Sequence, residues 1–169
     1  MKKIFIALAV FGALTVSCMA CHAEEVALGF DNRQWELGYH TVTDQQEIRE
    51  FVLKGENVKK WTELVTVQSF PGLQLNVDPE DYMNEMVRNL KKACPGAKVK
   101  LIRKGSSDIV FEWEIAGCSG QDNQYEIDRI IAGDRAMYVL HYAIKDPPIS
   151  PGRRSEWIRI LDQASLTGE

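Results

Sequence analysis

The chain has 169 residues, a length typical of one domain. A composition of 45% hydrophobic and 26% charged residues excludes a collagen-like or wholly disordered protein. The 24 acidic and 20 basic side chains give a net charge of −4, which argues against a general nucleic-acid binder because such proteins are usually basic.

Residues 1–23 predict an export signal peptide. Two lysines precede the apolar run 4–16, which is too short to span a membrane, since a spanning helix needs about 20 residues. Residues 21–23, Cys-His-Ala, have the small-x-small pattern at which signal peptidase cleaves. We therefore expect residues 24–169 to form a single exported α+β domain, periplasmic or secreted, without a transmembrane helix.

Cys18 supports an alternative processing route. Ser17 and Cys18 loosely resemble the end of a bacterial lipoprotein signal, in which the cysteine becomes the lipidated first residue. In that case a lipid anchors the mature protein to the membrane. The intact mass of the mature protein distinguishes lipidation at Cys18 from cleavage after Ala23.

A disulfide is predicted between Cys94 and Cys118, the two cysteines that remain once residues 1–23 are removed. The same removal takes away two lysines and shifts the net charge to −6. Exported proteins fold in oxidising compartments, where such a pair forms a bridge. Closing a loop of about 25 residues stabilises a fold by about 3.5 kcal/mol. A redox-active pair is the less favoured alternative because the spacing is not C-x-x-C.

Alternating apolar and polar residues predict three strands in the first half of the domain, over 34–43, 48–53 and 61–70. A helix follows from Asp78, whose side chain can cap the free N–H groups, with Pro79 tolerated at the first helical position. Residues 95–96, Pro-Gly, end this helix.

Four further strands are predicted in two hairpins, over 98–104, 109–116, 125–132 and 136–144. The helical spacing of Trp157, Ile160 and Leu161 predicts a last helix that starts at Ser155. Residues after Leu166 are expected to fray. The order β-β-β-α-β-β-β-β-α predicts an α+β fold, with an antiparallel sheet of about six to seven strands flanked by two helices.

This element order, over about residues 25–166, resembles the PsbP-like fold, an antiparallel sheet flanked by helices. Residues 55–68, Gly-Glu-Asn-Val-Lys-Lys-Trp-Thr-Glu-Leu-Val-Thr-Val-Gln, also resemble a segment of exported bacterial proteins of uncharacterised function. The resemblance implies a binding or assembly accessory, and it transfers no catalytic residue because such folds host many functions.

Two histidines, His40 and His141, lie in predicted strands and are expected to be half-buried or surface residues. Residues 24–169 lack H-E-x-x-H and C-x-x-C spacing, so we predict no metal and no cofactor. A hydrolase that uses His40 or His141 with nearby carboxylates stays open. No G-x-S-x-G elbow supports it.

Paired carboxylates occur twice at strand spacing, as Glu112 with Glu114 and as Glu126 with Asp128. We expect both pairs to form the solvated face of a one-sided sheet. If Glu112 or Glu114 lies deep in a cavity instead, glycan hydrolysis becomes a hypothesis to test.

Trp61 follows a turn and is a weak candidate for ligand contact, with Lys59 and Lys60 beside it favouring an anionic group. Arg153 and Arg154 are expected in an exposed loop before the last helix.

Together these features favour an exported, non-catalytic accessory or binding protein of the bacterial cell envelope. Its expected partner is an envelope protein or a small ligand, and not a nucleic acid. An envelope hydrolase and a subunit of an envelope assembly are the alternatives.

Overall fold

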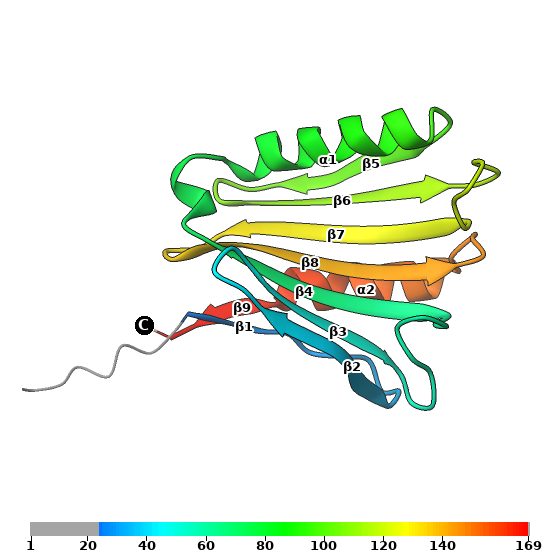
Figure 1. The fold of residues 1–169 in the computed structure, drawn as a ribbon, viewed down its shortest axis with the longest axis horizontal. Helices are drawn as coiled ribbons and strands as arrows, with labels where there is room; N and C mark the ends of the chain where they lie inside the picture. Colours follow the sequence, from blue (N-terminus) through cyan, green and yellow to red (C-terminus); the bar gives the residue numbers. More distant parts are fainter. Residues whose placement is uncertain (1–23, 169) are drawn as a thin grey trace, which may run out of the picture.

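The computed structural model describes residues 24–168, so the predicted export signal and lipidation of Cys18 lie outside the described residues. The largest element is a seven-stranded antiparallel sheet in the order β2-β3-β4-β8-β7-β6-β5 (Figure 1). Its strands are β2 (Trp35–Val42), β3 (Glu47–Leu53), β4 (Glu63–Pro71), β5 (Lys98–Lys104), β6 (Asp108–Ile115), β7 (Gln124–Ala132) and β8 (Ala136–Lys145).

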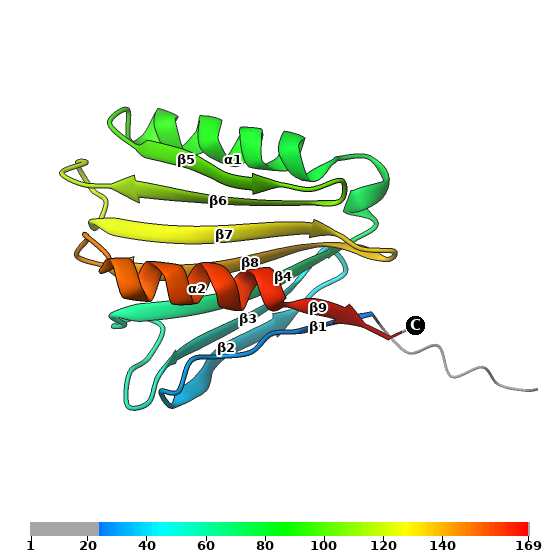
Figure 2. The ribbon, with the colours of Figure 1, turned by 180° about the vertical axis from the view of Figure 1, so that it is seen from behind.

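Two helices pack on opposite faces of this sheet. α1 (Pro79–Ala93) lies on the front face in Figure 1, over β6 and β7, and Figure 2 shows α2 (Pro151–Gln163) on the back face. A short 3-10 helix, η1 (Leu73–Leu75), precedes α1. β1 (Glu25–Ala27) pairs with β9 (Ser165–Thr167) in a separate two-stranded sheet. The predicted α+β class, a sheet flanked by two helices, is confirmed.

The predicted start of the last helix is wrong. α2 begins at Pro151 rather than at Ser155. The hydroxyl of Ser150 accepts a hydrogen bond from the backbone N–H of Arg153, and Pro151 suits the first helical position because it has no N–H to leave unpaired. Residues 151–154 are therefore helical and not a loop.

Several strand boundaries differ from the prediction by one or two residues. β4 begins at Glu63 rather than at residue 61. Fraying was predicted after Leu166, yet Thr167 is paired with Glu25, because Ser165–Thr167 form β9 against β1. The sequence pattern predicts neither this pair nor η1, since three-residue elements show no periodicity.

The back-face core centres on Trp157 of α2, which is fully buried. Its ring stacks on Tyr142 of β8, with centroids 4.0 Å apart and planes inclined by 7°. Trp35 meets the Trp157 ring edge-on at 5.5 Å. These contacts hold α2 on the sheet through aromatic burial.

A disulfide joins Cys94, the C-terminal cap of α1, to Cys118 in the loop between β6 and β7. Their Cα atoms are 5.6 Å apart, which confirms the predicted bridge. It ties the C-terminal end of α1 to the sheet and is consistent with an oxidising location outside the cytoplasm. Within residues 24–168, no helix combines the length and the apolar character needed to cross a membrane.

Candidate functional site

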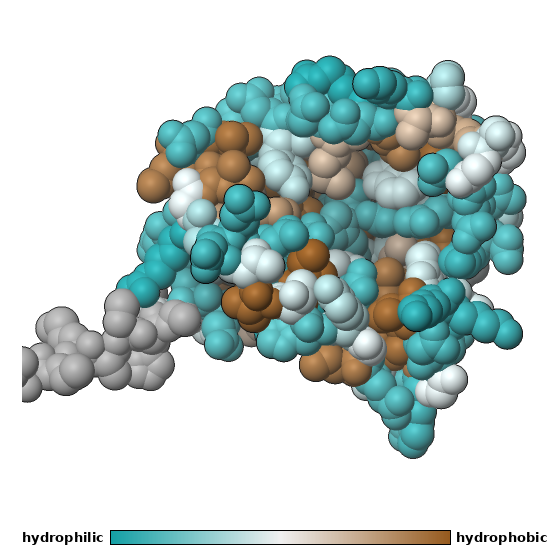
Figure 3. Space-filling model, in the orientation of Figure 1, coloured by the Kyte–Doolittle hydropathy of each residue, from teal (hydrophilic) through white to brown (hydrophobic). Residues whose placement is uncertain are grey.

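An apolar pocket of about 310 Å³ lies between α1 and β6 on the front face of the sheet. It is lined by Met86, Val87, Asn89, Leu90, Phe111 and Trp113. Met86, Val87 and Leu90 belong to the apolar stripe of α1 that faces the sheet, and the two aromatic rings come from alternate positions of β6. Figure 3 shows this face of the molecule, which is hollowed below α1.

Beside the pocket lies a charged cluster of Glu126, Asp128 and His141. Glu126 and Asp128 lie on β7, and the strand register sets His141 of β8 opposite Asp128. Nδ1 of His141 is 2.6 Å from Oδ1 of Asp128 and 2.8 Å from Oε1 of Glu126. The side chain of Asp128 is 0% exposed and that of Glu126 is 10% exposed. The prediction that these two acids form a solvated face is therefore wrong.

Neutral side chains hold the outer atoms of the cluster. Trp113, which also lines the pocket, donates its indole N–H to Oδ2 of Asp128 over 2.8 Å. Gln124 donates to Oε2 of Glu126 over 2.7 Å, and Nε2 of His141 lies 3.4 Å from Oε1 of Gln68. Trp113 thus links the apolar pocket directly to the buried charges.

The protonation of the three groups is coupled. Burial acts to lower the pKa of His141, but the neighbouring Asp128 carboxylate outweighs it and raises the pKa to about 10. Burial, followed by the charge of Glu126, raises the pKa of Asp128 well above its usual value. Burial also acts to raise the pKa of Glu126, yet the hydrogen bond with His141 lowers it. Two carboxylates therefore compete for one imidazolium.

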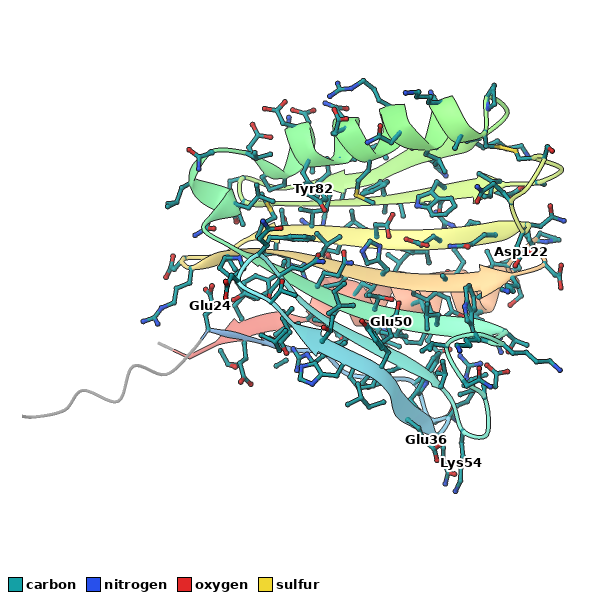
Figure 4. The ribbon with its side chains drawn as sticks, in the orientation of Figure 1. Glu24, Glu36, Glu50, Lys54, Tyr82 and Asp122 are labelled. Atoms are coloured by element: carbon teal, nitrogen blue, oxygen red, sulfur yellow. A yellow bond between two sulfur atoms is a disulfide. The ribbon has the colours of Figure 1, made fainter. Side chains whose placement is uncertain are left out.

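Two more titratable residues face the cluster across the hollow. Figure 4 shows Tyr82, which comes from α1, and Glu50, which lies on β3. Burial raises the pKa of Glu50, although the charge of His141 acts in the opposite direction. Burial and the nearby charge of Asp128 both raise the pKa of Tyr82. The hollow is therefore lined by acidic side chains on the strands of the sheet and by partly apolar side chains on α1.

Two other buried glutamates among the described residues, Glu63 and Glu112, have basic partners. Glu63 pairs with Arg33 at 2.6 Å and with Arg153, and Glu112 pairs with Arg154 at 2.6 Å. Arg153 and Arg154 are thus part of the first turn of α2, and the prediction of an exposed loop is wrong. Positive charge is unfavourable at a helix N-terminus, and these carboxylates compensate it while holding α2 on the back face.

The remaining candidates for acid–base chemistry lie apart from this cluster. His40 is exposed on the edge strand β2, where Nε2 contacts Glu47 at 3.0 Å. Glu114 pairs with Lys98 at the surface over 3.0 Å. Glu112 is buried, but its ion pairs lower its pKa against the effect of burial, which is the opposite of what a general acid requires.

Trp61, Lys59 and Lys60 lie in the loop between β3 and β4, apart from the residues that line the pocket. The two lysines are exposed, and the ammonium group of Lys145 lies over the Trp61 ring at 4.9 Å from its centroid. This cation–π contact occupies one face of the ring. Ligand contact at Trp61 stays a prediction.

The sequence did not indicate that Trp113 joins the pocket to the cluster, or that Gln68 and Gln124 contact the outer atoms of the cluster. The alternation of side chains places Trp113 on one face of β6, and it places Glu126 and Asp128 together on one face of β7. It could not show that Trp113 pairs with Glu126 across the sheet, because that register depends on the whole hairpin.

A model of an uncharacterised protein family matches residues 24–139, from β1 into β8. The matched segment includes α1, β6 and both carboxylates of the cluster, and His141 lies just beyond it. No curated protein matches the chain.

Proposed function

The chain belongs to this uncharacterised family, and we propose that it is an exported, non-catalytic binding protein of the bacterial cell envelope, with its ligand site in the pocket beneath α1. The observation that carries the proposal is the pocket of about 310 Å³ itself. Its size is at the lower end of the range for small-molecule sites, and most of its lining is apolar.

The lining favours a small apolar or amphipathic ligand. Met86, Val87 and Leu90 offer flexible aliphatic contact, while Phe111 and Trp113 offer aromatic surface. The indole N–H of Trp113 is already donated to Asp128, so only its ring is free for the ligand. We propose that the apolar part of the ligand lies under α1 and that a cationic or hydrogen-bond-donating head faces the acidic hollow.

Export and the finer classification of the fold belong to the same proposal. The pattern of residues 1–23 and the Cys94–Cys118 bridge support an extracytoplasmic location, periplasmic or secreted. Lipidation at Cys18 stays the alternative, and an added diacylglycerol mass on that residue would establish it. Two helices on opposite faces of an antiparallel sheet support a PsbP-like fold.

Binding of an apolar dye tests the proposed pocket. The wild-type protein is expected to bind N-phenyl-1-naphthylamine with a rise in dye fluorescence. Val87→Asp is expected to weaken binding by at least about tenfold, because it places an unpaired carboxylate in the pocket. Asn84→Asp, which adds the same charge at an exposed position of α1, is the matched control and should bind as the wild type does. Equal binding by all three proteins, or none by the wild type, would contradict the proposal.

The second candidate is an envelope hydrolase based on His141. The contact of Nδ1 with Asp128 favours it, because a carboxylate orients the histidine in many hydrolases. However, the side chain at the other ring nitrogen is the amide of Gln68 rather than a hydroxyl or thiol nucleophile. A screen of ester and glycan substrates with the wild type and His141→Ala separates the two candidates, and turnover lost in the variant would favour the hydrolase.

The third candidate is a subunit of an envelope assembly. β2 is an edge strand of the sheet and exposes large apolar side chains at Leu37, Tyr39 and Val42. An unpaired edge with apolar side chains can add a strand from another chain. Cross-linking in cells followed by purification tests this candidate, and recovery of the chain alone would count against it.

A further inference from the structure

We propose that Glu126, Asp128 and His141 form a binding site for a divalent transition-metal ion, with Zn²⁺ the best match to their donor atoms. Oε1, Oδ1 and Nδ1 of these residues lie within 4.8 Å of one another, and Nδ1 is 2.6 and 2.8 Å from the two oxygens. Ligand atoms bound about 2.0 Å from zinc are about 3 Å apart. Small side-chain movements therefore admit the ion, and the site does not rest on the proposed function of the pocket.

The outer atom of each proposed ligand is already held by a neutral group. Trp113 donates to Oδ2 of Asp128, and Gln124 donates to Oε2 of Glu126. Both contacts leave the other carboxylate oxygen facing Nδ1 of His141, on the side where the ion would bind. Such outer contacts orient the ligands of a metal site and are as much a part of it as the ligands.

Gln68 completes this outer layer at the histidine. Nε2 of His141 lies 3.4 Å from Oε1 of Gln68, an atom that can only accept a hydrogen bond. Without an ion, the protonated Nδ1 donates to the two carboxylates. Release of that proton to solvent when a metal binds frees the lone pair of Nδ1, while Nε2–H keeps donating to Oε1 of Gln68. This is the tautomer of histidine that binds a metal through Nδ1.

The charge of the cluster also favours a divalent cation. The buried carboxylates of Asp31, Glu63 and Glu112 each have an arginine partner. Among residues 24–168, neither Glu126 nor Asp128 has a lysine or arginine partner. Two buried carboxylates and a neutral imidazole balance the charge of a divalent ion, and buried charge is costly when it is not balanced. The rival occupant is a proton shared by the three side chains.

The donor set and the exposure of the cluster suggest the kind of ion and its route. One imidazole nitrogen and two carboxylate oxygens suit Zn²⁺ or Mn²⁺ better than a soft ion such as Cu⁺. The side chains of His141 and Glu126 are 13% and 10% exposed, so the ion reaches the site from the hollow on the front face. Three protein ligands leave a coordination position there for water or for a bound molecule.

Calorimetric titration with zinc chloride tests the site after treatment with EDTA, with the disulfide kept intact. The wild-type chain is expected to bind one ion. His141→Gln and Asp128→Asn should each weaken binding by at least about 100-fold, and Gln124→Ala by about tenfold because it removes only an outer contact. His40→Gln is the matched control, since His40 forms an exposed contact with Glu47 and should not affect zinc binding.

The N-terminal segment requires a second control, because Cys18, Cys21 and His22 could themselves bind zinc in an unprocessed chain. The double variant Cys18→Ser with Cys21→Ser should retain the wild-type affinity. Loss of binding in that variant, together with retained binding in Asp128→Asn, would overturn the proposal. No zinc binding by the wild-type chain would also overturn it and would favour the shared proton.

A measurement on the wild type alone tests the site even if the variants do not fold. X-ray absorption at the zinc edge should show one imidazole and otherwise oxygen ligands, without sulfur. Co²⁺ in place of zinc should give visible d–d bands without a thiolate charge-transfer band. Sulfur ligands, or only the oxygen ligands of a hydrated ion, would overturn the assignment.

Discussion

Replacing Trp157 with alanine is expected to lower the free energy of unfolding by about 4 kcal/mol, the largest loss we expect from a single substitution. The side chain is 0% exposed and stacks on Tyr142, so alanine removes the aromatic surface that holds α2 on the sheet and leaves a cavity. Urea denaturation followed by circular dichroism measures the change.

Trp157→Phe is the matched control for this prediction. Among the described residues no acceptor lies within hydrogen-bond distance of the buried indole N–H of Trp157. Phenylalanine keeps much of the stacked surface and removes that unpaired donor, so it should cost less than about 1.5 kcal/mol. Similar losses for the alanine and phenylalanine variants would contradict the role given to stacking and cavity formation.

Glu63→Ala is expected to lower the free energy of unfolding by about 3 kcal/mol. Glu63 pairs with Arg33 and Arg153 and accepts a hydrogen bond from the hydroxyl of Tyr142, so its removal leaves two guanidinium groups without their shared partner. Removal of one member of a buried ion pair typically costs 3–5 kcal/mol. We expect the lower end because the arginine side chains are 26% and 41% exposed and can reach water.

The pH dependence of stability tests the same carboxylate. Burial acts to raise the pKa of Glu63, but the hydrogen bond from Arg33 outweighs it and lowers the pKa. A carboxylate with a lowered pKa stabilises the fold fully above its unfolded pKa, about 4.3, and loses that contribution as pH falls through the folded value. The stability difference between wild type and Glu63→Ala should therefore shrink below about pH 4.

Glu114→Ala is the surface control for Glu63→Ala. Its partner Lys98 is 79% exposed, so breaking this pair should cost less than about 1 kcal/mol. Equal losses for Glu63→Ala and Glu114→Ala, measured by urea denaturation at neutral pH, would show that the buried network does not anchor α2.

Much of the fold could be predicted because its elements carry strong local patterns. β5 has the predicted bounds, 98–104, and α1 begins after Asp78, whose side chain accepts a hydrogen bond from the backbone N–H of Asp81 as the capping prediction requires. The start of α2 was harder to predict from the sequence. Ser150 and Pro151 carry its capping signal, whereas the apolar stripe that suggested the helix begins only at Trp157.

The candidate site could be predicted only in part. The sequence identified His141, Glu126 and Asp128 as candidates. It predicted that the two acids are exposed to solvent, whereas in the structure they are covered. Alternation shows which residues of a strand share a face, but not whether a distant element covers that face. The covering contact here comes from Trp113 on a neighbouring strand, and α1 supplies the other wall of the pocket from earlier in the chain.

We propose that this protein binds its ligand at the front face beneath α1. An NMR titration of ¹⁵N-labelled protein with N-phenyl-1-naphthylamine tests this site. We expect chemical-shift changes confined to α1 and β6, with the indole N–H of Trp113 among the largest. Shifts centred on the edge strand β2 or on α2, with the Trp113 signal unchanged, would contradict it.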